Sequence, residues 1–212
     1  SAGRHIYKRE HSFPIAVACD PAFNFVYEAN IRYLHHLGEV TYFIPLADTS
    51  LPDVGFVYLP GGYPELYLAA LSANRQMLQS IRRYVESGGK LLAECGGMMY
   101  LCDEIRDKNG DVYPMAGVLH QSATMENMKL RLGYRTLLYN ETRLKGHEFH
   151  YSRLVEQQNP LPSCAVAYTA KGVETDTPLY HYKNVWAGYT HLYWADPVGN
   201  EWFTKFVIDG NT

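Results

Sequence analysis

Long apolar runs are missing from this chain of 212 residues. No stretch approaches the roughly 20 apolar residues that a membrane-spanning helix needs. No charged segment leads into an apolar one that ends in a small-residue cleavage site. The net charge, −3, gives no electrostatic reason to expect a nucleic acid or an anionic membrane as a partner. We therefore expect a cytoplasmic protein that binds neither.

Cysteine is scarce and irregularly spaced. The four cysteines are Cys19, Cys95, Cys102 and Cys164, and no two of them form a CxxC pair. This pattern argues against a zinc ribbon and against a disulfide scaffold, and it favours a reducing compartment. A composition of 47% apolar and 19% charged residues is that of a globular protein. The length predicts one domain, with or without an elaborated edge.

The first half alternates short apolar strands with helical patterns. This alternation predicts a mostly parallel central sheet with helices on both faces, and the working residues of such sheets follow the carboxyl ends of the strands. The strands are expected at 14–19, 40–44, 54–59 and 90–94, and the helices at 25–37, 73–86 and 97–102.

The second half contains little helical pattern. Expected strands at 130–138, 148–154 and 164–168 predict an antiparallel elaboration on the edge of the main sheet. A strand at 185–189 is expected to return to the main sheet and to place His191 at its carboxyl end. A closing helix is expected at 198–208.

Cys95 lies at the expected strand-to-helix turn in the sequence Ala-Glu-Cys-Gly-Gly, residues 93–97. Small neighbours permit a strained, sharp turn that exposes a nucleophile at its tip, and the start of a helix favours a thiolate. The pattern predicts a catalytic nucleophile. A structural cysteine buried before a glycine turn is the alternative, and Ala93 stands where such elbows usually have glycine.

A nucleophilic cysteine needs a base. His191 is the candidate because it follows a strand of the same sheet, whereas His35 and His36 are expected on a helix surface. Gly61 and Gly62 follow the third strand, where glycines let backbone N–H groups approach a substrate carbonyl closely. A plain turn is the alternative interpretation of these two glycines.

Several stretches, taken in order, match one family. The chain resembles the C-terminal glutamine amidotransferase domain of the cobyrinic acid a,c-diamide synthase family. The matching stretches are residues 22–30, 60–66 (PGGYPEL), 71–74, 93–101 (AECGGMMYL), 115–118, 132–135, 146–152 (GHEFHYS) and 188–192 (GYTHL).

The resemblance implies a flavodoxin-like class I glutamine amidotransferase fold. It implies that Cys95 attacks the glutamine side-chain amide, that His191 is the base, and that the backbones around Gly62 and Gly96 form the oxyanion hole. The ammonia released would serve an ATP- and Mg-dependent synthetase domain that amidates the a and c carboxylates of cobyrinic or hydrogenobyrinic acid. We expect no cofactor and no metal in this domain, and a homodimer is left open.

Two departures qualify this expectation. The chain has no GxxxxGK[ST] phosphate loop, so the synthetase half is absent. We therefore expect residues 1–13 to be a linker from that half and residues 14–212 to be the glutaminase domain. Triad amidotransferases have a glutamate two residues after the histidine, and here that position is Tyr193. A carboxylate of Glu148 or Glu94, or a backbone carbonyl, is the hypothesis for what orients His191.

Alternatives remain. Another tetrapyrrole acceptor, as in cobyric acid synthase or nickel-sirohydrochlorin diamide synthase, keeps the same enzyme class. A non-catalytic interaction domain would explain Tyr193. A cysteine hydrolase or chaperone is disfavoured because Gly96, not histidine, follows Cys95. His147 would point away from Glu148 and His150 on a strand, which argues against a metal site. We expect a substrate-side or interdomain role for Glu148, His150 and Tyr63.

Overall fold

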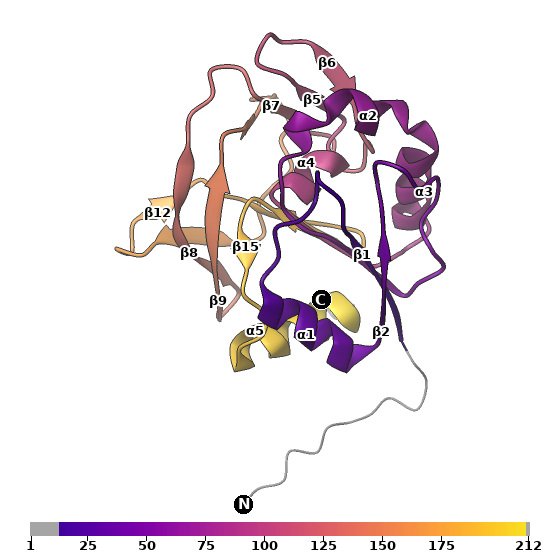
Figure 1. The fold of residues 1–212 in the computed structure, drawn as a ribbon. Helices are drawn as coiled ribbons and strands as arrows, with labels where there is room; N and C mark the ends of the chain where they lie inside the picture. The colour runs from indigo at the N-terminus through magenta and orange to yellow at the C-terminus, as the bar shows by residue number, and fades with distance from the viewer. Residues whose placement is uncertain (1–12, 211–212) are drawn as a thin grey trace, which may run out of the picture.

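The computed structural model describes residues 13–210 (Figure 1). Residues 1–12 of the expected linker therefore lie outside the described residues. Within the described part of the chain, no helix is both long and apolar enough to cross a bilayer.

The main sheet has six strands in the order β13-β14-β4-β3-β1-β2. Its pairs are parallel except for the hairpin of β13 and β14. All five strands predicted for this sheet are confirmed to within two residues at their starts and ends, whereas β13 was not predicted. The strands are β1 (Pro14–Ala18), β2 (Glu39–Phe43), β3 (Phe56–Leu59), β4 (Leu91–Glu94), β13 (Leu179–Tyr182) and β14 (Val185–Gly188).

Strand residues alternate between two hydrophobic cores, as the period of two in a β-strand requires. In β3, Val57 and Leu59 belong to the core beneath α3 and α4, whereas Phe56 and Tyr58 belong to the core beneath α1 and α5. Because both faces are covered, the strand residues are apolar almost throughout. The predicted α/β architecture is therefore confirmed.

Helices cover both faces of the sheet (Figure 1). Two of them differ from expectation. The first begins at Glu28 rather than at Phe25, because Phe25 forms a β-bridge to Gly61. The expected helix at 73–86 begins two residues later, at Arg75, because a further helix that was not expected ends at Ala73 and Asn74 separates the two. The Asn74 amide donates to the carbonyls of Pro45 and Asp48. The helices are α1 (Glu28–Leu37), the 3-10 helix η1 (Pro64–Leu66), α2 (Leu68–Ala73), α3 (Arg75–Glu86), α4 (Gly96–Leu101), α5 (Pro197–Trp202) and the π-helix η2 (Phe203–Ile208).

Two smaller sheets form the elaboration of the second half. The hairpin of β8 and β9 dominates one of them and stands beside the main sheet in Figure 1. The strand expected at 148–154 was placed too late, because β9 runs back to a turn at Asn140, which has a positive φ of 52°. The larger sheet contains β8 (Arg131–Tyr139), β9 (Thr142–His150), β11 (Val166–Thr169), β12 (Glu174–Thr175) and β15 (His191–Leu192). The smaller sheet, most of which was not predicted, contains β5 (Glu104–Arg106), β6 (Val112–Pro114), β7 (Ser122–Thr124) and β10 (Arg153–Leu154).

Phe203 joins the closing helices to the sheet, since its ring stacks on Trp194 at 4.3 Å and meets Phe56 edge-on at 5.4 Å. We predict that Phe203→Ala lowers the free energy of unfolding by about 3–5 kcal/mol, because it leaves a cavity in a close-packed core. Urea denaturation followed by circular dichroism measures the loss. The matched control is Val198→Ala at an exposed position of α5, with an expected change of about 0.5 kcal/mol or less. Equal losses in the two variants would contradict the prediction.

Candidate active site

Cys95 forms the elbow between β4 and α4. Its φ of 52° and ψ of −108° lie in a region that side chains other than glycine seldom adopt, so the backbone is strained there. The Cys95 N–H donates to the carbonyl of Gly188 at 2.7 Å, which extends the pairing of β4 with β14 by one residue. The predicted elbow geometry is thus present.

The prediction that the Cys95 side chain is exposed at the tip of the turn is wrong. The residue is only 3% exposed, and its Sγ–H donates to the carbonyl of Phe149 on β9 at 3.6 Å. The elbow does project from the sheet edge, but the hairpin of β8 and β9 covers it. Sequence reasoning did not place this hairpin over the elbow.

The thiol is not stabilised as a thiolate in this state, contrary to expectation. Burial raises the pKa of Cys95 well above its usual value of 9.0, and the carboxylate of Glu65 raises it further. The N–H of Gly96 opposes the shift by donating to the sulfur, but it is outweighed. The increase in pKa caused by removal of the thiol from water is therefore larger than any decrease caused by the start of the short helix α4. Cys95 is a neutral thiol at pH 7.

His191 reaches the same edge of the sheet through β15. This strand pairs with β9, so that His191 lies opposite His147, and the two rings stack at 4.9 Å. Phe25 meets the His191 ring edge-on at 4.6 Å. Burial lowers the pKa of His191 to about 3, and His147 and His150 add to the effect. The imidazole is therefore neutral and free to accept a proton.

Gly61 and Gly62 lie close to both candidate catalytic residues: Gly61 contacts His191, and Gly62 lies beside Gly96, the neighbour of Cys95. A Cβ at Gly61 would lie 2.1 Å from Cε1 of His191, so only glycine permits this approach of the ring to the backbone. Gly62 has a φ of 152°, and a Cβ there would lie 2.2 Å from the carbonyl oxygen of Ala22. A Cβ at Gly96 would lie 3.2 Å from the Gly62 nitrogen, which places the two expected oxyanion backbones side by side.

The expected partners of the His191 ring are not there. Its Nδ1 is buried and has no hydrogen-bond partner among the described residues. Glu94 instead accepts from the Tyr58 hydroxyl and from the N–H of Leu192, and burial raises its pKa to about 8. Packing against Phe25 and His147, rather than a carboxylate, fixes the ring.

Tyr193 does not replace the usual acid. It is partly exposed and packs edge-on against Tyr27 at 5.5 Å, while its N–H donates to the carbonyl of Lys145. Tyr27 was not singled out as a site residue, although its hydroxyl bonds Nδ1 of His147 and donates to the carbonyl of His191 at 3.4 Å. The only sequence signal for Tyr27 was its place in the stretch 22–30 that matches the family, and this match does not predict which atoms Tyr27 contacts.

Glu148 is the centre of a buried polar cluster. Its carboxylate accepts from Arg135 at 2.7 Å, from Thr177 at 2.7 Å and from Nε2 of His150 at 2.6 Å. His147 lies on the opposite face of β9, as the strand period predicted. The hydrogen bonds of Glu148 are thus satisfied within the protein, so the hypothesis that it orients His191 is wrong.

His150 lines an open pocket of about 570 Å³. Its ring stacks on Tyr189 at 3.6 Å, and both residues line the pocket together with Arg131 and Arg153. Neither Cys95 nor His191 lines this pocket. Tyr63 is 40% exposed above the elbow, where its phenol and Cys95 interact electrostatically. The substrate-side or interdomain role of these residues remains a prediction.

The buried thiol can be tested by alkylation. We predict that iodoacetamide modifies exposed Cys19 faster than Cys95 at pH 7, and that the Cys95 rate still rises through pH 9, because only a thiolate reacts. Peptide mass mapping at timed intervals measures both rates in one sample. Cys102, which is also buried, is the internal control for slow reaction. A Cys95 rate that exceeds the Cys19 rate at pH 7 would indicate a resident thiolate.

The Glu148 cluster predicts a pH dependence of stability. Burial alone would raise the pKa of Glu148, but the hydrogen bonds from His150 and Thr177 outweigh it and lower the pKa from 4.5 to about 2. Because the folded pKa is depressed, this carboxylate stabilises the protein above pH 4.5, and the stabilisation is lost as the pH falls through about 2. Glu148→Gln should therefore cost about 3 kcal/mol of unfolding free energy at pH 7 and almost none near pH 2.

Urea denaturation at a series of pH values measures this gap between the wild type and Glu148→Gln. Glu174→Gln, at an exposed position on β12, is the matched control and should change stability by about 0.5 kcal/mol or less. A gap that stays constant with pH would contradict the assignment of an ionised, buried Glu148.

Comparison with known families adds to this geometry. The model of the CobB/CobQ-like glutamine amidotransferase domain family matches residues 14–198. A hydrogenobyrinate a,c-diamide synthase of Pseudomonas aeruginosa is 40% identical over 185 residues, which cover 84% of this chain and 41% of that protein. A cobyrinate a,c-diamide synthase of Fusobacterium nucleatum is 39% identical over 188 residues, with the same two coverages. The chain thus spans about 41% of the length of these curated relatives.

Solved structures confirm the fold. The PurLQS structure from Thermotoga maritima gives a TM-score of 0.58 at 17% identity and covers 85% of this chain and 88% of its own. The crystal structure of a glutamine amidotransferase gives a TM-score of 0.56 at 15% identity and covers 91% of this chain and 98% of its own. The expected flavodoxin-like class I amidotransferase fold is confirmed.

Proposed function

Because the chain belongs to the CobB/CobQ-like glutamine amidotransferase domain family, we propose that it hydrolyses glutamine through Cys95 and supplies the ammonia for an amidation. The observation on which this rests is the strained elbow at Cys95, which shares one sheet edge with a neutral, buried His191 and the backbones of Gly61 and Gly62.

The proposed reaction needs only these groups, glutamine and water. The Cys95 thiol gives its proton to His191 as the sulfur bonds the amide carbon, and the oxyanion that forms is held by the N–H groups near Gly62 and Gly96. His191 returns the proton to the leaving nitrogen, and the C–N bond breaks to release ammonia and leave a thioester. Water then attacks the thioester, and His191 relays its proton to the sulfur as glutamate leaves.

Cys95 and His191 are both neutral before the substrate binds, and this affects the expected rate of glutamine hydrolysis. A buried thiol with a raised pKa and a buried imidazole with a lowered one disfavour proton transfer before substrate binds. The chain by itself should therefore hydrolyse glutamine slowly. The proposed partner is an ATP- and Mg-dependent synthetase part that corresponds to the remaining length of the relatives.

The names of the relatives support cobyrinic or hydrogenobyrinic acid as the acceptor, amidated at its a and c carboxylates. Under this proposal the tetrapyrrole, ATP and Mg belong to the synthetase part, whereas glutamine alone belongs to the present chain. A different tetrapyrrole acceptor would leave the glutaminase proposal intact.

We predict that Cys95→Ala, in the enzyme complete with its synthetase part, lowers glutamine-dependent amidation by about three orders of magnitude or more, because the nucleophile is lost. Amidation driven by added ammonium chloride should continue at the wild-type rate. Amide formation on cobyrinic acid, followed by mass spectrometry, measures both activities. Cys19→Ala, at an exposed cysteine, is the matched control. Glutamine-dependent activity that survives in Cys95→Ala would refute the proposal and favour a non-catalytic interaction domain.

A further inference from the structure

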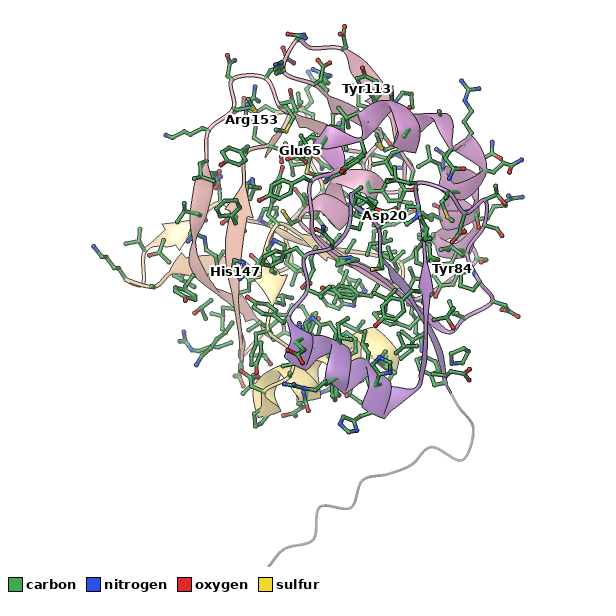
Figure 2. All side chains as sticks on the ribbon, viewed as in Figure 1. Asp20, Glu65, Tyr84, Tyr113, His147 and Arg153 are labelled. Carbon is green, nitrogen blue, oxygen red and sulfur yellow. The ribbon has the colours of Figure 1, made fainter. Side chains whose placement is uncertain are left out.

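Glu65 is a partly buried carboxylate next to the nucleophile that the proposed reaction does not use. It lies in η1, directly after the turn formed by Gly61 and Gly62. Pro64 of the same short helix lies against Gly96, where a Cβ would come within 2.7 Å of the proline ring. The packing of η1 therefore fixes Glu65 beside the elbow, and its side chain is labelled in Figure 2.

The carboxylate of Glu65 lacks a hydrogen-bond partner on one of its two oxygens within the described part of the chain. Its own backbone N–H donates to it, but Oε2 is buried and has no hydrogen-bond partner among the described residues. Leaving such an acceptor buried without a partner is unfavourable, and more so when the group is charged. A buried acceptor beside a nucleophile that has no partner in the protein is suited to a donor that arrives with the substrate.

The surroundings of Glu65 hold no free cation that could be that donor. The groups that interact with it electrostatically are Cys95, Tyr63 and His150. Only His150 can become positive, but its Nε2 is bonded to Glu148 and its Nδ1 to the carbonyl of Ser152. No ion pair joins Glu65 to an arginine or lysine within residues 13–210. Within the described residues, no free cation therefore pairs with Glu65.

We propose that Glu65 binds the α-ammonium group of the glutamine whose side-chain amide is attacked by Cys95. This inference rests on the proposed glutaminase function and names its specificity determinant. Glutamine has a single cationic group, and only a few bonds separate it from the amide carbon. A carboxylate near the nucleophile thus selects free glutamine over amides that lack an α-ammonium group. Burial, which raises the pKa of Glu65 in the empty site, strengthens the pairing once the cation enters.

The test compares two electrophiles in the chain together with its synthetase part. One is a diazoketone that mimics glutamine, and the other is the same diazoketone without the α-amino group. Mass spectrometry follows their covalent attachment to Cys95. We predict that Glu65→Gln slows attachment of the amino-bearing label about tenfold or more, and leaves attachment of the des-amino label within about twofold. Glu65→Asp, which keeps the charge, should retain part of the preference for the amino-bearing label.

Glu39→Gln, an exposed carboxylate on β2 at the far edge of the main sheet, is the matched control and should react with both labels as the wild type does. Equal slowing of both labels in Glu65→Gln, or slowing of neither, would overturn the role of Glu65 while the glutaminase proposal stands. A wild-type Cys95 that reacts with neither diazoketone would instead overturn the proposed function and this inference with it.

Discussion

The parallel pairing of β4 with β14 is the constraint on which the site depends. Its register sets Glu94 opposite Gly188, and the Cys95 N–H adds one more bond to the same carbonyl ladder. The chain leaves both strands at the same edge, so the elbow and the segment that leads to His191 emerge together. A shift of one residue in this register would turn the side chains of β14 to the opposite faces of the sheet.

The hairpin of β8 and β9 imposes the second condition, which is removal of the site from water. It brings the carbonyl of Phe149 to the Cys95 sulfur and sets His147 against the His191 ring. The Glu148 cluster lies within the same hairpin, where Arg135 links β8 to β9, and Thr177 links the hairpin to the segment that leads into β13. Stability and electrostatics are thus coupled, because the interactions that hold the hairpin in place also keep the thiol and the imidazole neutral.

Much of the parallel sheet could be predicted because its strands are continuous apolar runs that end in proline, glycine or aspartate. The position of Cys95 and His191 at one edge followed from topology alone. The burial of Cys95 could not be predicted, since it depends on a hairpin whose first strand begins at Arg131, 36 positions later, and the docking of that hairpin leaves no local pattern. The unpartnered Nδ1 of His191 also has no sequence signature, because it reflects a contact that is not made.

Glu65 illustrates a further limit of sequence reasoning. A glutamate in a turn reads as an ordinary exposed residue, and only the packing of Pro64 on Gly96 reveals that one of its oxygens is enclosed. The contacts of Phe25 and Tyr27 in the site could not be predicted for a similar reason. They occupy a segment expected to be helical, whereas the β-bridge between Phe25 and Gly61 holds that segment open and against the His191 ring.

The burial of Cys95 also bears on the lifetime of the enzyme. Peroxide oxidises cysteine through the thiolate, in proportion to its exposure, and the early products of that reaction place oxygen atoms on the sulfur. Here the sulfur is protonated, enclosed and in contact with the Phe149 carbonyl, so the resting site contains little of the reactive thiolate and exposes almost none of its surface to water. The enclosure that slows the resting site therefore also shields its sulfur from oxidative damage between turnovers.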